Sequence, residues 1–204
     1  MLSYIVLSLN GHVAELVYAY ASEAYAARLG GSNPLVPTMR NTEAALKWIT
    51  QLLVQESIPF EIDGGMAAEF YGSNRELADI DINVSKEGFA KLAPIVKEYI
   101  TFGPAQYKDS NWDLMLLSLR YAGQNIDIAP LGQIKYFDKE DKVWMSFPET
   151  LDDVRVFDYL DMKVPVVNEI KLLIYKKQLA RGVDRKDYHL ILSNLLKQWF
   201  GKKS

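Results

Sequence analysis

The sequence predicts an α/β (α+β) protein in which helices flank a small mixed β-sheet and the C-terminal part is helical. Three observations predict this fold class. Short apolar runs with a period of two, such as residues 79–84 and 124–129, indicate β-strands. Apolar residues spaced three and four apart, as in residues 43–55, indicate helices packed on a core. The segment after residue 168 has helix-capping residues and helical spacing.

The chain up to residue 99 alternates between predicted helices and strands. In order, these are a helix at 43–55, a strand at 60–63, a helix at 65–71, a strand at 79–84 and a helix at 86–99. The first helix has its apolar residues on one side, at Leu46, Ile49 and Leu53. The last one contains Pro94, and we expect it to continue in spite of this residue.

The second half of the chain predicts a hairpin, two short strands and two helices. The hairpin joins residues 112–121 to residues 124–129 around Ala122-Gly123, and the short strands lie at 143–147 and 154–157. Asn168 is expected to cap a helix over 169–180 that Gly182 ends, and Asp184 to cap a last helix through Trp199.

The strand at 79–84 carries the most informative residues, Asp79-Ile80-Asp81. Strand side chains alternate between faces, so the two carboxylates project from one side and the isoleucine from the other. Two adjacent carboxylates repel each other and are costly to desolvate. A hard divalent cation removes both costs, and Mg²⁺ is commonly held by one or two carboxylates together with substrate phosphates. The pattern favours a metal-dependent phosphoryl or nucleotidyl transfer site.

A third acid, Asp127, lies between apolar neighbours in the predicted hairpin. Three acids on adjacent strands are typical of a two-metal site that holds the attacking and leaving oxygens in line. Two alternatives remain open at this point. In the first, the acids are solvated positions on an open sheet face. In the second, Asp113 on the preceding strand takes the third position in place of Asp127.

The pair Gly64-Gly65 follows the strand at 60–63 and opens a helix. Glycines let the backbone approach a ligand closely, and amides at a new helix start attract phosphate. A tight strand-to-helix turn without a ligand would need the same glycines. Arg75, just before the acidic strand, has two readings: contact with a triphosphate, or an ion pair with Glu76 or Asp79.

Taken together, these motifs resemble the nucleotidyltransferase superfamily that includes DNA polymerase beta. The matching segments are Asp63-Gly64-Gly65-Met66-Ala67, Gly72-Ser73-Asn74-Arg75, Ala78-Asp79-Ile80-Asp81-Ile82 and, near the C-terminus, Lys171…Arg185-Lys186-Asp187. Within the superfamily, the small lincosamide and aminoglycoside nucleotidyltransferases and the toxin-type enzymes of abortive-infection systems are the most similar. The resemblance covers about residues 39–196. Ala78 departs from it, because relatives often have Ser, Thr or His before the first metal-binding acid.

The resemblance implies a fold, a reaction and a set of roles. Asp79 and Asp81 would bind metal ions, two Mg²⁺ being expected, and Asp127 would bind one of them and accept the proton of the attacking hydroxyl. The nucleotide-binding residues would be Gly64, Gly65, Arg75, Lys171 and Arg185. The substrate would be a nucleoside triphosphate, and the acceptor hydroxyl would belong to a small molecule, a protein or an RNA end.

The amino-acid composition narrows the remaining classes of function and of metal site. The formal net charge of −3 gives no reason to expect a broad nucleic-acid-binding surface, and the basic residues between 171 and 186 are equally consistent with a solvated helix face. The chain has no cysteine, which excludes disulfides, thiol catalysis and cysteine zinc sites. Its two histidines, His12 and His189, are too few for a histidine-rich metal site. We expect a cytoplasmic protein that does not span a membrane.

We expect three parts: an N-terminal extension at 1–38, a nucleotidyltransferase core at 39–135, and strands and helices at 136–204 that complete the site. The extension has helical apolar spacing between Val13 and Ala24. However, Gly31-Ser32-Asn33-Pro34 is also what the T-arm of a transfer RNA gene encodes in one frame. We therefore hypothesise that this extension is read-through of such a gene, that it has no function, and that the native start is Met39.

Two other functions remain open. A catalytically inactive protein with the same fold would act by binding, for instance to a protein partner in a toxin–antitoxin or defence system. A metal-dependent phosphoesterase would share the acids but usually brings more histidine ligands than this chain offers.

Overall fold

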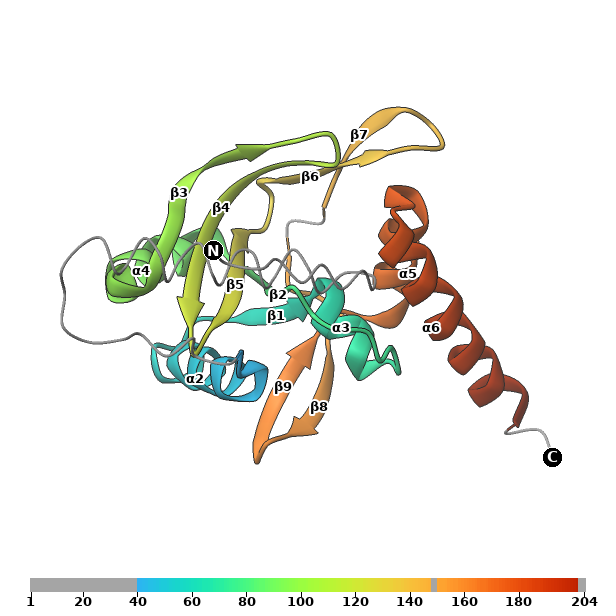
Figure 1. Ribbon diagram of the computed structural model, residues 1–204, viewed down its shortest axis with the longest axis horizontal. Helices are drawn as coiled ribbons and strands as arrows, with labels where there is room; N and C mark the ends of the chain where they lie inside the picture. Colours follow the sequence, from blue (N-terminus) through green and yellow to red (C-terminus); the bar gives the residue numbers. More distant parts are fainter. Residues whose placement is uncertain (1–39, 148–149, 202–204) are drawn as a thin grey trace, which may run out of the picture. The chain divides into compact units, whose positions relative to one another are not determined.

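The computed structural model describes residues 40–147 and 150–201, with side chains up to residue 198, and these residues belong to one compact unit (Figure 1). The predictions for residues 1–38, namely the helical spacing at 13–24, the read-through hypothesis and the start at Met39, fall outside the described residues. No helix in the described ranges is both long enough and apolar enough to cross a membrane.

A mixed β-sheet of nine strands runs through the described chain, which confirms the predicted fold class. The strands are β1 (Phe60–Asp63), β2 (Asp79–Val84), β3 (Ile100–Lys108), β4 (Trp112–Tyr121), β5 (Gln124–Pro130), β6 (Ile134–Asp138), β7 (Val143–Ser146), β8 (Arg155–Tyr159) and β9 (Met162–Val166). Their order in space is β7-β6-β4-β5-β2-β1-β9-β8, and β3 pairs with β4 outside this path. The pairs β2–β5 and β1–β9 are parallel, whereas the other pairs are antiparallel.

In the described residues, five α-helices pack around this sheet: α2 (Thr42–Gln55), α3 (Gly64–Phe70), α4 (Lys86–Ile95), α5 (Glu169–Leu179) and α6 (Gly182–Gly201). The side chains of Asn41, Ser85 and Asn168 accept hydrogen bonds from the first turns of α2, α4 and α5. The helix predicted at 86–99 is divided, since α4 ends at Ile95 and a 3₁₀ turn follows at Lys97–Tyr99. Figure 1 places α5 and α6 together at one side of the molecule.

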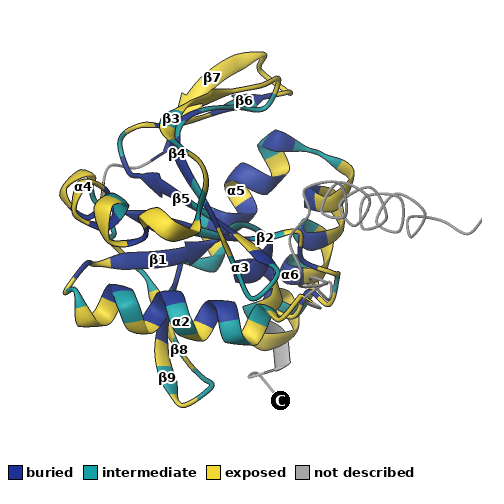
Figure 2. Cartoon of the chain, turned by 60° about the vertical axis from the view of Figure 1, so that its left-hand side comes forward, coloured by how far each residue is buried: buried dark blue, intermediate teal, exposed yellow. Residues whose placement is uncertain are grey.

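The two faces of the sheet have different environments. On β2, Ile80, Ile82 and Val84 are at most 1% exposed and belong to the core. The helices α2 and α4 lie on this face, since Thr42 of α2 bonds to Gln124 and α4 packs close to Val84. In Figure 2 the central strands β1 and β5 are dark blue, whereas β7 is yellow. The opposite face carries the acids of β2 and is where α5 lies.

Three strands, β3, β6 and β9, are not predicted by the sequence pattern. The segment of β3 contains Gly103-Pro104, where the register against β4 shifts, so the alternation of apolar residues is interrupted. The segment of β9 contains Pro165, which also argues against a strand. The strand β6 has only five residues and begins soon after Gly132. In each case pairing with a neighbouring strand overrides a weak local signal.

The boundary between the last two helices differs from the prediction. Gly182 does not end α5 but begins α6, and Ala180 takes the left-handed conformation (φ 48°) at the end of α5. Asp184 lies inside the first turn of α6, where its carboxylate accepts the backbone N–H of Arg181 at 3.2 Å. Ala180, a non-glycine residue, thus occupies the left-handed position at the end of α5, where glycine is usual.

Candidate active site

One row of residues across the sheet carries three acids. Asp63 of β1 is the register partner of Asp81 of β2, and Asp81 is the partner of Asp127 of β5. Ser118 of β4 continues the row beside Asp127. Register partners lie roughly 5 Å apart and point to the same side of a sheet. The pairing of four strands therefore gathers these side chains on one face.

Asp79 precedes Asp81 by two residues and shares its face. Oxygen atoms of Asp79, Asp81 and Asp127 all lie within 4.8 Å of one another, and each residue is half-buried. The structure thus brings together the three acids that the sequence singles out. Asp113, the competing third acid, lies on the face of β4 opposite to that of Ser118. Its carboxylate accepts hydrogen bonds from Gln106 and Lys108 at 2.5 and 2.6 Å.

The acids are electrostatically unfavourable in the absence of a cation. Burial raises the pKa of Asp81 well above its ordinary value, and Asp79, Asp127 and Asp63 raise it further, whereas Lys176 lowers it. Burial also raises the pKa of Asp127, with Asp79 adding to the effect and a hydrogen bond from Ser118 opposing it. This excess of negative charge is what binding of a divalent cation would relieve.

The Gly64-Gly65 turn leaves no room for side chains. Gly64 has φ +62°, and a Cβ there would lie 1.7 Å from Oδ2 of Asp81. A Cβ on Gly65 would lie 2.5 Å from Nη2 of Arg75. The Gly64 N–H donates to Oδ1 of Asp63 at 2.7 Å, and the Gly65 N–H donates to Oδ2 of Asp81 at 3.4 Å. The backbone of the turn therefore touches the acids on one side and a guanidinium on the other.

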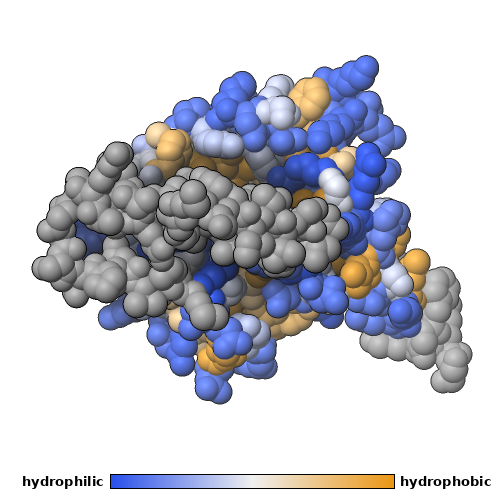
Figure 3. Space-filling model, in the orientation of Figure 1, coloured by the Kyte–Doolittle hydropathy of each residue, from blue (hydrophilic) through white to orange (hydrophobic). Residues whose placement is uncertain are grey.

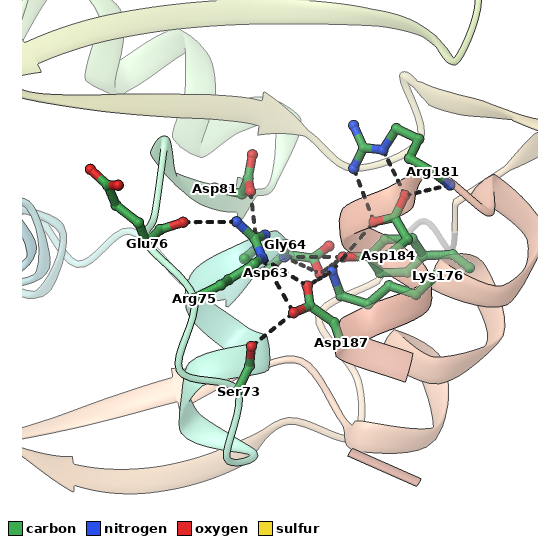
Figure 4. Close-up of polar contacts among 12 residues, drawn as sticks. Asp63, Gly64, Ser73, Arg75, Glu76, Asp81, Lys176, Arg181, Asp184 and Asp187 are labelled. Carbon is green, nitrogen blue, oxygen red and sulfur yellow. Dashed lines mark hydrogen bonds and ion pairs between the residues drawn. The ribbon is translucent and has the colours of Figure 1, made fainter. Parts of the chain in front are cut away.

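Arg75 makes a contact that neither sequence-based interpretation includes. Its Nε donates to both carboxylate oxygens of Asp187 at 3.2 Å, and its Nη1 donates to the carbonyl of Glu76 at 3.2 Å (Figure 4). Ser73 donates to the same Asp187 at 2.8 Å. Helix α6 thus holds Arg75 against the Gly64-Gly65 turn.

The structure places Lys171 and Arg185, two of the predicted nucleotide-binding residues, outside the cavity that the acids line. Nζ of Lys171 donates to the backbone carbonyl of Asp152, and Arg185 is exposed on α6. The cations that line the cavity are Arg75 and Arg181. The prediction chose Lys171 from its position in a motif, and helix geometry turns that residue away from the acids.

A buried charge cluster joins α5 to α6 behind the site. Lys176 is 1% exposed, and its Nζ lies 2.8 Å from Asp187 and 3.6 Å from Asp184. Arg181 donates from Nε to Asp184 at 2.6 Å (Figure 4). Asp184 and Asp187 are completely buried. From the sequence, Lys176 and Arg181 were only members of the basic run between residues 171 and 186, interpreted as a local basic patch or a solvated helix face, and their burial in a charge cluster was not predicted.

We predict that Lys176→Met strongly destabilises the protein, because it removes the charge that Asp184 and Asp187 share in the interior. The expected loss in the free energy of unfolding is about 3 kcal/mol or more, measured by urea denaturation. Lys177→Met is the matched control. Lys177 is exposed and lies 3.9 Å from Glu140, so we expect a change within about 0.5 kcal/mol. Equal effects of the two substitutions would contradict this account of the cluster.

A second buried network lies next to the row of acids. Nδ2 of Asn83 donates to Oε1 of Glu61 at 3.1 Å and to Oδ2 of Asp63 at 2.9 Å. The hydroxyl of Tyr175 donates to Oδ1 of Asp63 at 2.8 Å. Burial raises the pKa of Glu61 to about 7, and Asp63 adds to the effect, whereas Asn83 and Lys171 oppose it. Neither Glu61 nor Tyr175 was predicted, since an acid in a short strand and a tyrosine in a helix carry no distinctive pattern.

We predict that this carboxyl makes stability depend on pH. A raised folded-state pKa means that the stabilisation is present below pH 4.5 and is lost as the pH rises through about 7. The loss is on the order of 3 kcal/mol at most. Glu61→Gln keeps the acceptor for Asn83 and should flatten the change in unfolding free energy between pH 5 and pH 8. The exposed control Glu98→Gln should leave the slope as in the wild type; an unchanged slope in Glu61→Gln would contradict the prediction.

The acids lie on the floor of a cavity of about 590 Å³. Residues of β1 to β5 on the acidic face form the floor, and the Gly64-Gly65 turn and Arg75 lie along one side. Tyr175 and Arg181 also line the cavity, and both lie close to Trp112 of β4: the ring centroids of Tyr175 and Trp112 are 6.4 Å apart, and the guanidinium carbon of Arg181 is 5.8 Å from the Trp112 ring centroid. The other side is apolar and aromatic and comes mainly from β3 and β4. A volume in this range is usual for small-molecule sites.

Comparisons with known proteins agree with this geometry at the level of the fold. A candidate nucleotidyltransferase from Thermotoga maritima superposes with a TM-score of 0.54, at 21% sequence identity, over 78% of this chain and 92% of its own. The lincosamide antibiotic adenylyltransferase LnuA, in its lincomycin-bound form, superposes with a TM-score of 0.53, at 19% identity, over 76% of this chain and 99% of its own. The chain has the nucleotidyltransferase fold. No protein-family model matches the sequence, and no curated protein matches it either.

Proposed function

We propose that this protein is a Mg²⁺-dependent nucleotidyltransferase that moves a nucleoside monophosphate from a nucleoside triphosphate to an acceptor hydroxyl. One observation carries the proposal. In a chain with the nucleotidyltransferase fold, oxygens of Asp79, Asp81 and Asp127 converge within 4.8 Å on a cavity floor beside a glycine turn.

The donor set fits the metal that such a reaction needs. Asp79, Asp81 and Asp127 supply hard carboxylate oxygens, which Mg²⁺ prefers, and the cluster has more negative charge than the surrounding cations balance. When bound, Mg²⁺ would offset the charge of the triphosphate and stabilise the charge that develops during transfer.

The residues of the chain divide the remaining tasks. Asp127 would take the proton of the acceptor hydroxyl, and its raised pKa makes it a stronger base than an ordinary carboxylate. The acceptor oxygen forms a bond to the α-phosphorus as the bond to the pyrophosphate oxygen breaks. Arg75, which lies over Gly65, and Arg181 would attract the phosphates that leave.

Incubation of the full-length protein with each α-labelled nucleoside triphosphate and Mg²⁺ tests the proposal. Transfer and pyrophosphate release are measured with candidate acceptors, of which lincomycin is a reasonable first probe, because the similar fold of LnuA is known with lincomycin bound. Asp127→Asn should still bind the triphosphate but lose turnover by about 10³-fold. Asp113→Asn, on the other face of β4, should behave like the wild type.

Failure of the wild type to bind any triphosphate in the presence of Mg²⁺ would refute the proposal. Binding without turnover, equal in wild type and Asp127→Asn, would instead favour the catalytically inactive alternative. Release of free nucleoside monophosphate alone, with water as the only acceptor, would favour the phosphoesterase.

A further inference from the structure

The side of the cavity formed by β3 and β4 is made of apolar and aromatic residues. Phe102 and Tyr107 of β3 are 39% and 37% exposed, and their rings meet edge to face with centroids 6.3 Å apart. Leu114 and Leu116 of β4 lie beside them and are 9% and 8% exposed. The strand register puts Phe102 opposite Ser118 and Tyr107 opposite Leu114, so this wall continues the face that carries the acids.

The position of this wall relative to the acids suggests what binds there. Asp127 is the acid closest to it, because Ser118 of β4 is its register partner. The Gly64-Gly65 turn and Arg75 lie on the opposite side, beyond Asp81. In-line displacement needs the nucleophile and the leaving pyrophosphate on opposite sides of the α-phosphorus. If pyrophosphate leaves toward Arg75, the acceptor approaches along the β3–β4 wall.

The charges on the wall are few. Among the described residues that line the cavity from β3, β4 and the turn between them, none is a cation and only Asp109 is an acid. Its carboxylate already accepts the N–H groups of Asn111 and Trp112 at 2.7 Å and the hydroxyl of Tyr107 at 3.2 Å. When Mg²⁺ offsets the charge of the neighbouring acids, a ligand with several positive charges would leave most of them without partners along this apolar wall, which is costly.

We infer that this wall, hereafter the β3–β4 subsite (Phe102, Tyr107, Leu114 and Leu116), binds the acceptor, and that the acceptor is a small molecule with an apolar ring or chain, a free hydroxyl and at most one positive charge. The inference rests on the proposed nucleotidyl transfer, since it uses the direction of the reaction. A nucleic-acid acceptor does not fit, because the four residues of the subsite offer phosphates no cation, and the neighbouring Arg181, whose guanidinium lies 5.8 Å from the Trp112 ring centroid, is already bound to Asp184. Exposed apolar side chains also occur at Val143 and Met145 of β7, but neither lines the cavity, and the described surface that Figure 3 shows is mostly hydrophilic.

Calorimetric titration in the presence of Mg²⁺, with three probes of different charge, tests the inference. The probes are 1-naphthol, which is uncharged, lincomycin, which carries one positive charge, and tobramycin, which carries several. The full-length protein should bind 1-naphthol and lincomycin, and should bind tobramycin at least about tenfold more weakly. Phe102→Ala and Tyr107→Ala should each weaken 1-naphthol binding about tenfold, because each substitution removes an aromatic ring that contacts the probe. Both side chains are partly exposed, so we expect the variants to fold.

Tyr99→Ala is the matched control, because Tyr99 is also 37% exposed and in aromatic contacts but does not line the cavity. It should bind 1-naphthol like the wild type. Three results would overturn the inference: no saturable binding of 1-naphthol, tighter binding of tobramycin than of 1-naphthol, or equal weakening in Phe102→Ala and Tyr99→Ala. The titrations contain no nucleotide. An inactive protein with an intact subsite would still bind 1-naphthol, and an active enzyme without it would release pyrophosphate but give no 1-naphthol signal.

Discussion

Asp81→Asn should lower nucleotidyl transfer by about 10³-fold or more, equivalent to about 4 kcal/mol, and should at the same time stabilise the metal-free fold. The two effects have one cause. Burial raises the pKa of Asp81, and the neighbouring Asp79, Asp127 and Asp63 raise it further, so its negative charge is unfavourable until a cation binds. Asparagine keeps an oxygen that can accept the Gly65 N–H. It removes the charge that a metal ion needs.

Pyrophosphate release and thermal unfolding in the presence of a chelator measure the two effects. We expect the melting temperature to rise by about 2–4 °C, which corresponds to about 1 kcal/mol in a chain of this size. Asp113→Asn is the control for both measurements, because Asp113 pairs with Lys108 away from the acids. A lower melting temperature in Asp81→Asn, or turnover close to that of the wild type, would show that Asp81 is an ordinary structural acid.

Gly64→Ala should damage both the fold and the reaction. The alanine Cβ would lie 1.7 Å from Oδ2 of Asp81, and the backbone has φ +62°, which costs a non-glycine residue about 1–2 kcal/mol. Asp81 must move to relieve the clash. A displacement of about 1 Å at reacting groups can lower the rate about 10²-fold. We therefore expect the free energy of unfolding to fall by more than about 2 kcal/mol and transfer by about 10²-fold.

Gly182→Ala tests whether these effects come from the position and not from the loss of a glycine. A Cβ on Gly182, in the first turn of α6, would meet nothing within 4 Å. Alanine there should leave activity unchanged and raise the free energy of unfolding by about 0.4–1 kcal/mol. Chemical denaturation of both variants, alongside transfer assays, makes the comparison. If Gly64→Ala and Gly182→Ala behaved alike, neither the fold nor the reaction would depend on the close approach of the Gly64-Gly65 turn to Asp81.

The three acids were predictable because the residues next to each of them in the sequence indicate a strand and the face on which the acid lies. Alternation fixes the face of Asp79 and Asp81 within one strand, and the Ala122-Gly123 turn fixes the hairpin that carries Asp127. The parallel pairing of β2 with β5 was not readable from the sequence, and it is this pairing that places Asp81 beside Asp127. The prediction of a two-metal site took the three acids to lie on adjacent strands, and the structure shows their oxygens within 4.8 Å of one another.

The cations and the buried network were not predictable in the same way. Helix α5 is apolar around much of its circumference, from Leu172 to Tyr175, so helical periodicity does not show which lysine faces inward. Lys171 was chosen and lies toward the surface, whereas Lys176 is buried between two acids of α6. The partner of Arg75, Asp187, is 112 residues away and depends on how α6 packs.

The residues after 136 contribute in two ways to the described unit. The strands β8 and β9 extend the sheet beyond β1. Helix α5 supplies Tyr175, the link between α5 and α6 supplies Arg181, and α6 supplies Asp187. We propose that this C-terminal part completes the site and is not a separate functional module. The proposal for residues 1–38, that they are read-through without function, is tested by the coding DNA, which should contain a transfer RNA fold upstream of the Met39 codon.

A crystal structure with Mg²⁺ and a triphosphate whose α–β bridging oxygen is replaced by methylene tests the central claim most directly. The account predicts metal density bound to Asp79, Asp81 and Asp127 and to phosphate oxygens, with the β- and γ-phosphates near Gly65 and Arg75. A nucleotide bound elsewhere, with the three carboxylates free of metal, would contradict it.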